Sequence, residues 1–325
     1  MLVIQLSNEE HRPLLRSLID NPSLSEFLRY NKIITSVAFF ATLHSQHIPD
    51  AFKFKLKRYY LYLEEAKKIA EILEREGIEY SVIKTFSPLP KDISDIDLLV
   101  NPEQAEEAKK LLLNLGYSLR KEGFEQDLYS KVVNKITIDI ELHTSIAASS
   151  YEYYDTRHVL RESIYFNGIR VPDPAHSLLI ISAHDIMKDL YIPLAHILDF
   201  YILSDQADCD KLINYSSLYG LTLPLLLFIT LTEIAIGKTI RCKLHKDKLR
   251  SFLATYVKIL KIRPVIKVQL PLVLVSYIES FQSKVKREGF TLALKQLFSL
   301  PSGKGINALL HNILPLNPEV KEIWE

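Results

Sequence analysis

The stretch 135–143, KITIDIELH, alternates apolar and polar residues along its whole length. A period of two predicts a strand with one apolar face and one polar face. The polar face carries Thr137, Asp139, Glu141 and His143. An antiparallel strand with one solvated face produces the same alternation, so this pattern predicts the strand and leaves the purpose of its acids open.

A second pattern, YSVIKTFSPLPKDISDIDLLV over residues 80–100, predicts two short strands joined by a polar, proline-containing loop. Asp95 and Asp97 stand two positions apart in the second strand and therefore point to the same side. Adjacent carboxylates repel each other and resist burial without a partner, and a divalent cation such as Mg²⁺ supplies one. Two solvated acids at a strand end are the simpler alternative. If the 135–143 strand lies beside this one, Asp139 or Glu141 adds a third carboxylate.

Helical spacing of apolar residues dominates the chain before these strands. Residues 7–57 read as helices, and Ser7 with Glu10 has the spacing of a capping box. One helix is expected to end near His44, and a longer one to run over residues 49–76 until Gly77 stops it.

Turn and cap residues divide the middle of the chain. Asn101 followed by proline predicts a helix start, and Gly116 predicts its end. Asn134 is expected to turn the chain between two strands. Asn167 and Gly168 are a strong two-residue hairpin signal. The region 78–143 is therefore expected to form a small unit of strands and helix.

From Asp173 onward the pattern predicts helices only, separated by prolines. The apolar run 221–236 is shorter than the roughly 20 residues that span a membrane, so it is expected to be a buried core helix. Helices are expected near residues 174–190, 192–204, 208–219, 223–236, 245–262, 270–287 and 291–298.

Charge and cysteine content narrow the possible partners and compartments. The 40 Lys and Arg residues nearly balance the 39 Asp and Glu residues, which argues against a global basic field for nucleic acid. Cys209 and Cys242 lie far apart without a C-x-x-C motif, which favours a reducing cytoplasm and argues against zinc-finger or disulfide frameworks. The N-terminal stretch lacks the charged start of a signal peptide, so a cytoplasmic location is expected.

The order of strand, small-residue loop, acidic strand, helix and later acidic strand resembles DNA polymerase β-type nucleotidyltransferases. The sequence is more similar still to an uncharacterised nucleotidyltransferase family that has a long helical C-terminal half. The resemblance covers roughly residues 50–240. It rests on Ile83-Lys84-Thr85, on Asp95-Ile96-Asp97-Leu98-Leu99-Val100, on Glu141-Leu142-His143 and on the helical run from Pro172 to Gly237.

This resemblance implies an α+β fold: a small mixed β-sheet nucleotidyltransferase core with an N-terminal helical arm and an all-α C-terminal domain. The expected divisions are residues 1–57 for the arm, 58–172 for the α/β catalytic domain and 173–325 for the C-terminal domain. One departure concerns the end of the first strand. The superfamily usually has Gly-Gly or Gly-Ser there, whereas this chain has Lys84-Thr85-Phe86-Ser87.

The activity that the resemblance implies is transfer of an NMP group from an NTP to a hydroxyl acceptor, with Mg²⁺ or Mn²⁺. Asp95 and Asp97 would bridge two ions, and Glu141 or Asp139 would hold the ion that activates the acceptor. Glu141 fits the family's acid-Leu-His triplet better, whereas Asp139 has the same geometry in principle. His143 could orient a carboxylate. Lys84, Thr85 and Ser87 are candidates to contact the triphosphate. The acceptor, which could be a small molecule, an RNA end or a protein hydroxyl, stays open, as do the choice of NTP and the oligomeric state.

Two other functions are compatible with the sequence. The missing glycine pair is also expected of a binding protein on a degenerate nucleotidyltransferase fold. The adjacent His184 and Asp185, with acids at Asp189 and Asp199, resemble HD-type metal phosphohydrolases, which need a further upstream histidine. His158 or His176 is the candidate for that histidine. The spacing to these histidines is poor, so a hydrogen-bonded pair between packed helices is the preferred interpretation of His184 and Asp185.

Overall fold

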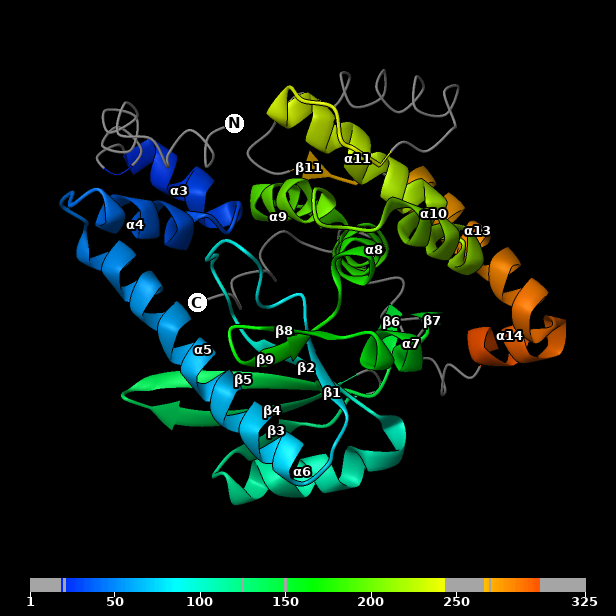
Figure 1. The fold of residues 1–325 in the computed structure, drawn as a ribbon, viewed down its shortest axis with the longest axis horizontal. Helices are drawn as coiled ribbons and strands as arrows, with labels where there is room; N and C mark the ends of the chain where they lie inside the picture. The colour runs from blue at the N-terminus through cyan, green and yellow to red at the C-terminus, as the bar shows by residue number, and fades with distance from the viewer. Residues whose placement is uncertain are drawn as a thin grey trace.

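A five-stranded mixed sheet lies between two groups of helices in the computed structural model (Figure 1). Helices α5 and α6 cover one face of this sheet, and the helical C-terminal half packs against the other. The α+β fold class is thereby confirmed. The structure describes residue 19 and residues 22–123, 126–148, 151–242, 266–268 and 270–298.

The strand order in the sheet is β1-β2-β5-β4-β3. Strand β2 pairs with β5 in parallel, and the other neighbouring pairs are antiparallel. The strands that the alternation predicted are thus present, and the two acidic ones are neighbours. Their bounds are Tyr80–Ile83 for β1, Ile96–Val100 for β2, Ser118–Lys121 for β3, Gln126–Val133 for β4 and Ile136–His143 for β5.

Both predicted hairpins are confirmed. Asn134 and Lys135, with φ of 51° and 67°, form the turn between β4 and β5. Asn167 and Gly168, with φ of 50° and 84°, join β8 (Ile164–Phe166) to β9 (Ile169–Val171). Positive φ at both central residues gives the turn a twist that matches the flanking strands, which is why Asn and Gly mark these positions in the sequence.

The apolar face of the sheet packs against α5 (Asp50–Arg75) and α6 (Ala105–Asn114). As predicted, Gly77, with φ of 69°, follows the end of α5. The Asn101 side chain accepts a hydrogen bond from the Glu103 amide at the 3₁₀ turn that precedes α6. The buried residues of this layer include Tyr62, Ala66, Ile69, Val82, Ile96, Leu98, Ala108, Leu112, Ile138 and Ile140.

Two helices stand where the N-terminal pattern predicted one helix ending near His44. Helix α3 (Pro22–Tyr30) and α4 (Ile34–Leu43) are separated at Lys32, whose φ of 56° interrupts right-handed helix. The proposed capping box at Ser7 lies outside the described residues.

The C-terminal half is built mainly of helices, and five of the predicted helices have counterparts close to their expected bounds. Helix α11 is buried along most of its length, as expected. Among the described residues, no helix combines the length and apolar character that crossing a membrane requires. The predicted helix at 245–262 lies outside the described residues. The helices are α8 (Pro174–His184), α9 (Leu194–Ser204), α10 (Cys209–Tyr219), α11 (Thr222–Ile236), α13 (Leu270–Glu288) and α14 (Phe290–Phe298).

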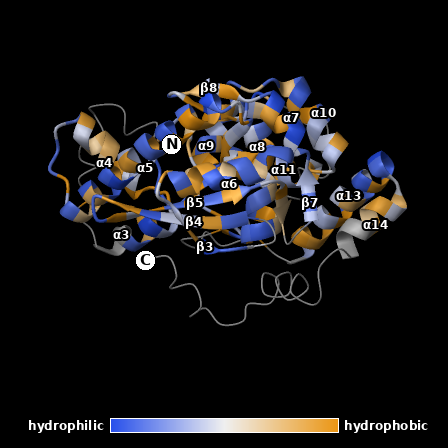
Figure 2. Cartoon of the chain, turned by 90° about the horizontal axis from the view of Figure 1, so that it is seen from below, coloured by the Kyte–Doolittle hydropathy of each residue, from blue (hydrophilic) through white to orange (hydrophobic). Residues whose placement is uncertain are grey.

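Hydrophobic and hydrophilic residues alternate along α13, as expected of a helix with one buried face (Figure 2), whereas α8 and α11 are buried along most of their length. Helix α8 ends in a π-helical turn, Asp185–Asp189, which is followed by Leu190 in the left-handed region at φ 60°. The expected single helix to residue 190 is therefore shorter.

Several short elements lack a sequence signal. Strands β6 (Ile146–Ala148) and β7 (Tyr151–Tyr154) form a hairpin, and α7 (Thr156–Arg161) follows them. Strand β10 (Tyr191–Ile192) pairs with β11 (Ile266–Lys267), so the expectation of helices alone after Asp173 is wrong at this point. Two-residue strands are too short to show an alternation.

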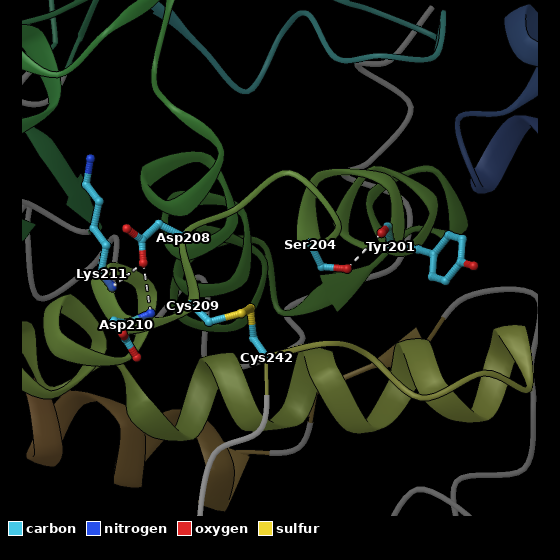
Figure 3. Close-up of a disulfide and its surroundings, with 7 residues drawn as sticks. All are labelled: Tyr201, Ser204, Asp208, Cys209, Asp210, Lys211 and Cys242. Atoms are coloured by element: carbon cyan, nitrogen blue, oxygen red, sulfur yellow. Dashed lines mark hydrogen bonds between the residues drawn. A yellow bond between two sulfur atoms is a disulfide. The ribbon is translucent and has the colours of Figure 1, made fainter.

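Cys209 and Cys242 form a disulfide, with Cα atoms 5.1 Å apart (Figure 3). The expectation that the two cysteines form no disulfide is therefore wrong. Cys209 begins α10 and Cys242 follows the end of α11, and the antiparallel packing of these helices brings distant sequence positions together. A disulfide removes the support that cysteine usage gave to a reducing cytoplasm.

We expect the free energy of unfolding of the double variant Cys209→Ser/Cys242→Ser to be about 3–4 kcal/mol lower than that of the wild type, because the disulfide closes a loop of 33 residues. Urea unfolding of both proteins without reductant measures the difference. Wild-type protein treated with a reductant should unfold like the variant, and equal stability of all three samples would contradict the expectation.

A half-buried polar network at the start of α8 joins several helices. Glu162 accepts hydrogen bonds from Tyr215 (3.1 Å) and lies 3.0 Å from Nε2 of His176 and 2.5 Å from the Lys211 ammonium. Lys211 also pairs with Asp173, the residue that caps α8. Burial alone would raise the pKa of Glu162, but its hydrogen bonds to Lys211, His176 and Tyr215 outweigh burial and lower the pKa to about 2.

This network predicts a specific acid sensitivity. The folded pKa of Glu162 lies below its ordinary value of 4.5, so the stabilisation is complete above pH 4.5 and is lost as pH falls toward 2. We expect Glu162→Gln to lower the free energy of unfolding by about 2–3 kcal/mol at pH 7, and by much less near pH 2. Urea unfolding at several pH values measures this. The exposed acid Glu106 provides the matched control, Glu106→Gln, and an equal loss for Glu162→Gln at pH 7 and pH 2 would refute the expectation.

Candidate active site

The polar face of the sheet points toward the helical half. Ile83 and Leu99 lie on this face and belong to the apolar core around α8. Asp97 on β2 pairs in register with Glu141 on β5 across the parallel strands. The alternation that buries Leu98 and Leu142 on the far side therefore brings Asp97 and Glu141 together at the boundary between the sheet and the helices.

Asp97, Glu141 and His143 form the centre of this site, with ligand atoms within 4.8 Å of one another. Nε2 of His143 lies 3.2 Å from Oδ1 of Asp97 and 3.6 Å from Oε2 of Glu141. Asp97 and His143 are buried, whereas 23% of the Glu141 side chain is exposed. Glu141 is thus the carboxylate that solvent can reach.

Asp95 stands just before β2, and its Oδ2 accepts a hydrogen bond from the Ser94 hydroxyl at 2.7 Å. Burial, followed by the charges of Asp97 and Glu141, raises the pKa of Asp95 to about 7. Its carboxylate is not part of the tight group around Asp97, although it feels the same negative charge. The site therefore concentrates more negative charge than its protein partners neutralise.

Lys84 supplies the nearest positive charge. Its ammonium lies 2.8 Å from Oδ1 of Asp97 and 3.0 Å from Nε2 of His184, and 11% of its side chain is exposed. Burial opposes the charge of Lys84, but Asp97 outweighs burial and raises the pKa of Lys84. The same pairing, with help from His143, overcomes burial and holds the pKa of Asp97 well below its ordinary value.

The backbone of Lys84 is in the left-handed region, with φ of 57°. A non-glycine residue in this region costs roughly 1–3 kcal/mol. Glycine would adopt such a conformation without this penalty. The chain retains a lysine side chain here in spite of the backbone cost, which fits a role for the ammonium itself.

The hydroxyls of Thr85 and Ser87 are already engaged inside the protein. Thr85 Oγ1 accepts from the Asp97 amide at 2.9 Å and lies 3.3 Å from Oδ2 of Asp97. Ser87 donates to the carbonyl of Leu89 at 2.9 Å. Thr85 therefore holds the Asp97 strand in place, and Ser87 shapes the loop.

Asp139 shares the polar face of β5 with Glu141, as the alternation predicted, but it has other partners. Its carboxylate accepts a hydrogen bond from Ser130 on the neighbouring β4. The structure therefore brings Glu141 to Asp97 and places Asp139 one pleat repeat away. The alternation alone left these two acids equivalent, and only the resemblance favoured Glu141.

The loop that joins β1 to β2 is held from both sides, by contacts that the sequence did not indicate. Lys91 is buried, and its ammonium donates to the Lys84 carbonyl at 2.6 Å and to Asp199 of α9 at 2.8 Å. Asp92 accepts from the amide of Thr35 on α4 at 2.9 Å. The sequence around Lys91 is typical of a polar loop, so the burial of this lysine was not predicted.

His184 and Asp185 occupy the end of α8 and its π-helical turn. Asp185 is fully buried and lies 2.8 Å from Nδ1 of His196 on α9, which is the helix-packing hydrogen bond expected as the simpler alternative. The upstream histidines that an HD site needs lie elsewhere: His158 contacts Tyr219, and His176 contacts Tyr154 and Glu162.

Residues 44–237 match the model of a family described as uncharacterised nucleotidyltransferase. The match covers the sheet, α5, and the helices from α8 to α11. No curated protein was found to match the chain. The site described above lies entirely inside the matched region.

The Lys84 pairing predicts two effects of Lys84→Ala. Binding of NTP should weaken by about 1.5–3 kcal/mol, the worth of a charge-assisted hydrogen bond. The metal-free protein should also melt earlier, because Asp97 loses its buried partner, and an excess of Mg²⁺ should restore part of the melting temperature.

Calorimetry with NTP and thermal melts measure these two effects. The control is Lys131→Ala, which removes a lysine paired with Glu65 on the opposite side of the sheet. A Lys84→Ala protein that binds NTP normally but melts earlier would show that Lys84 is structural alone.

Proposed function

Since the chain belongs to the uncharacterised nucleotidyltransferase family, we propose that it moves an NMP group from an NTP to a hydroxyl acceptor, with the help of Mg²⁺ or Mn²⁺. The observation that carries the proposal is the in-register pairing of Asp97 with Glu141 beside the Lys84 ammonium. Nucleotidyl transfer needs cations at a triphosphate and a carboxylate near the acceptor, and this arrangement supplies both kinds of group.

The donor set fits a hard divalent cation. Asp97 and Glu141 offer carboxylate oxygens, and burial together with the charges of these two residues raises the pKa of Asp95 to about 7. Asp97 and Glu141 would hold the ion, and the nearby charge of Asp95 would add to its attraction. Bound there, it would lower the pKa of an acceptor hydroxyl and neutralise charge on the departing pyrophosphate.

The residues of the chain have separate tasks in this proposal. Lys84 donates from its ammonium to phosphate oxygens. His143 and Thr85 hold the Asp97 carboxylate from two sides. Glu141, the most exposed acid of the centre, faces the acceptor and takes part in positioning its hydroxyl. The buried Lys91–Asp199 pair keeps the loop after β1 against the helical half.

One observation favours a second candidate function. The hydroxyls of Thr85 and Ser87 are used inside the protein, and the loop after β1 has no glycine for close approach to phosphate. A binding protein on a degenerate nucleotidyltransferase fold would show these features. A catalytic protein would transfer a labelled NMP group from an NTP to an acceptor, whereas a binding-only protein would not.

The test is transfer of label. The protein is incubated with each α-labelled NTP, with Mg²⁺ or Mn²⁺, and with a cell extract as the source of acceptors. We expect label on an acceptor with wild-type protein, and loss of at least about 100-fold with Asp95→Asn/Asp97→Asn, since removing key charge stabilisation costs that much or more. The matched control is Glu106→Gln/Glu107→Gln, two exposed acids on α6.

The same double variant tests binding. Calorimetric binding of Mg²⁺-NTP should disappear in Asp95→Asn/Asp97→Asn while its circular dichroism stays that of wild type. Unchanged NTP binding in this variant would contradict the assignment of the site. The absence of label transfer and of any thermal shift with every NTP would favour the binding-only function.

A further inference from the structure

Lys84 has two partners on opposite sides, and one of them comes from the helical half. Its ammonium lies between Oδ1 of Asp97, at 2.8 Å, and Nε2 of His184, at 3.0 Å. His184 is the last residue of α8, where the helix changes to the π-helical turn. Such turns are frequent at functional sites.

The chemistry of the contact fixes the state of the His184 ring. An ammonium can only donate, so Nε2 must be the unprotonated nitrogen and Nδ1 carries the ring proton. Nδ1 makes no hydrogen bond to the described residues, but the Asp189 carboxylate 3.5 Å away is a negative neighbour that is compatible with a proton on this nitrogen. Burial, reinforced by the charge of Lys84, lowers the pKa of His184 well below its ordinary value. His184 is therefore a neutral acceptor.

A divalent cation at Asp97 would conflict with the position of Lys84. Oδ1 of Asp97 is contacted by both Lys84 and His143 in this structure. A cation that takes this oxygen repels the ammonium, and a buried ammonium without an acceptor is costly. His184 stands on the other side of the ammonium and can accept it without a change in its own charge.

We infer that His184 is a positioning residue: it holds the Lys84 ammonium off Asp97 when a divalent cation binds there, and keeps it beside the bound triphosphate. This inference rests on the proposed function. Through His184, the helical half therefore controls the affinity of the sheet carboxylates for a metal ion. His184 itself is not a metal ligand in this arrangement.

The test measures metal binding without nucleotide. Mn²⁺ is titrated into the full chain, and free Mn²⁺ is followed by electron paramagnetic resonance. His184→Leu, which lacks an acceptor, should bind Mn²⁺ about tenfold more weakly, the usual scale of an indirect effect on a metal site. His184→Gln, whose amide oxygen can accept from Lys84, should stay within about twofold of wild type. If His184→Leu fails to fold, the His184→Gln variant still tests the inference.

Lys84→Met separates positioning from direct ligation. Without the competing ammonium, Mn²⁺ binding should tighten roughly 5- to 10-fold, while NTP binding weakens. In this background, His184→Leu should change Mn²⁺ affinity by less than about twofold, because the residue it positions is gone. The control is His158→Leu, a half-buried histidine that contacts Tyr219, and it should bind Mn²⁺ like wild type.

The outcomes distinguish this inference from the proposed function. If wild-type protein binds no Mn²⁺, both are overturned. If wild type binds Mn²⁺ and His184→Leu binds it equally well, only the role of His184 is overturned. A loss in His184→Leu that persists undiminished in the Lys84→Met background would make His184 a direct ligand and overturn the positioning role.

Discussion

The ion pair between Lys84 and Asp97 allows acidic side chains to face the helical half at all. Asp97 and Glu141 meet on the sheet face that is also packed by Ile83 and Leu99, and Asp95 stands just before this strand. Carboxylates in such surroundings repel one another and lose hydration, and the rise in the pKa of Asp95 to about 7 shows the strain on the group that lacks a lysine. The Lys84 ammonium at the end of β1 offsets part of this repulsion between the carboxylates.

Sequence periodicity predicted which residues share a face, because the side-chain period of a strand is independent of its neighbours. It predicted β1, β2, β4 and β5, both hairpins and the boundaries of α5. The choice between Asp139 and Glu141 lay beyond it, because both satisfy the same alternation. That choice depends on the register with β2 and on Ser130 of β4, which engages Asp139. Register is a property of two strands together.

The contributions of the helical half were not predictable for a related reason. His184 and Asp199 lie roughly a hundred residues from Lys84 and Lys91, and no local pattern links such positions. The disulfide has the same origin: Cys209 and Cys242 become neighbours only through the packing of α10 and α11. Lys32 and Lys84 both have a left-handed backbone conformation. Lysine rarely adopts this conformation, so the sequence did not predict it at either position.

The parallel pairing of β2 with β5 is the contact of this sheet that needs the longest chain closure, which leads us to expect that it forms late. Strands β1 and β2 form a local pair, and β3, β4 and β5 form a second set through short turns, so both can form early. Only the later docking of β5 against β2 closes a long loop and brings Glu141 to Asp97. Lys84 directly follows the first pair and lies beside Asp97 in the native fold. We therefore expect the counter-charge to be close to Asp97 before Glu141 arrives, so that docking brings together no uncompensated cluster of acids.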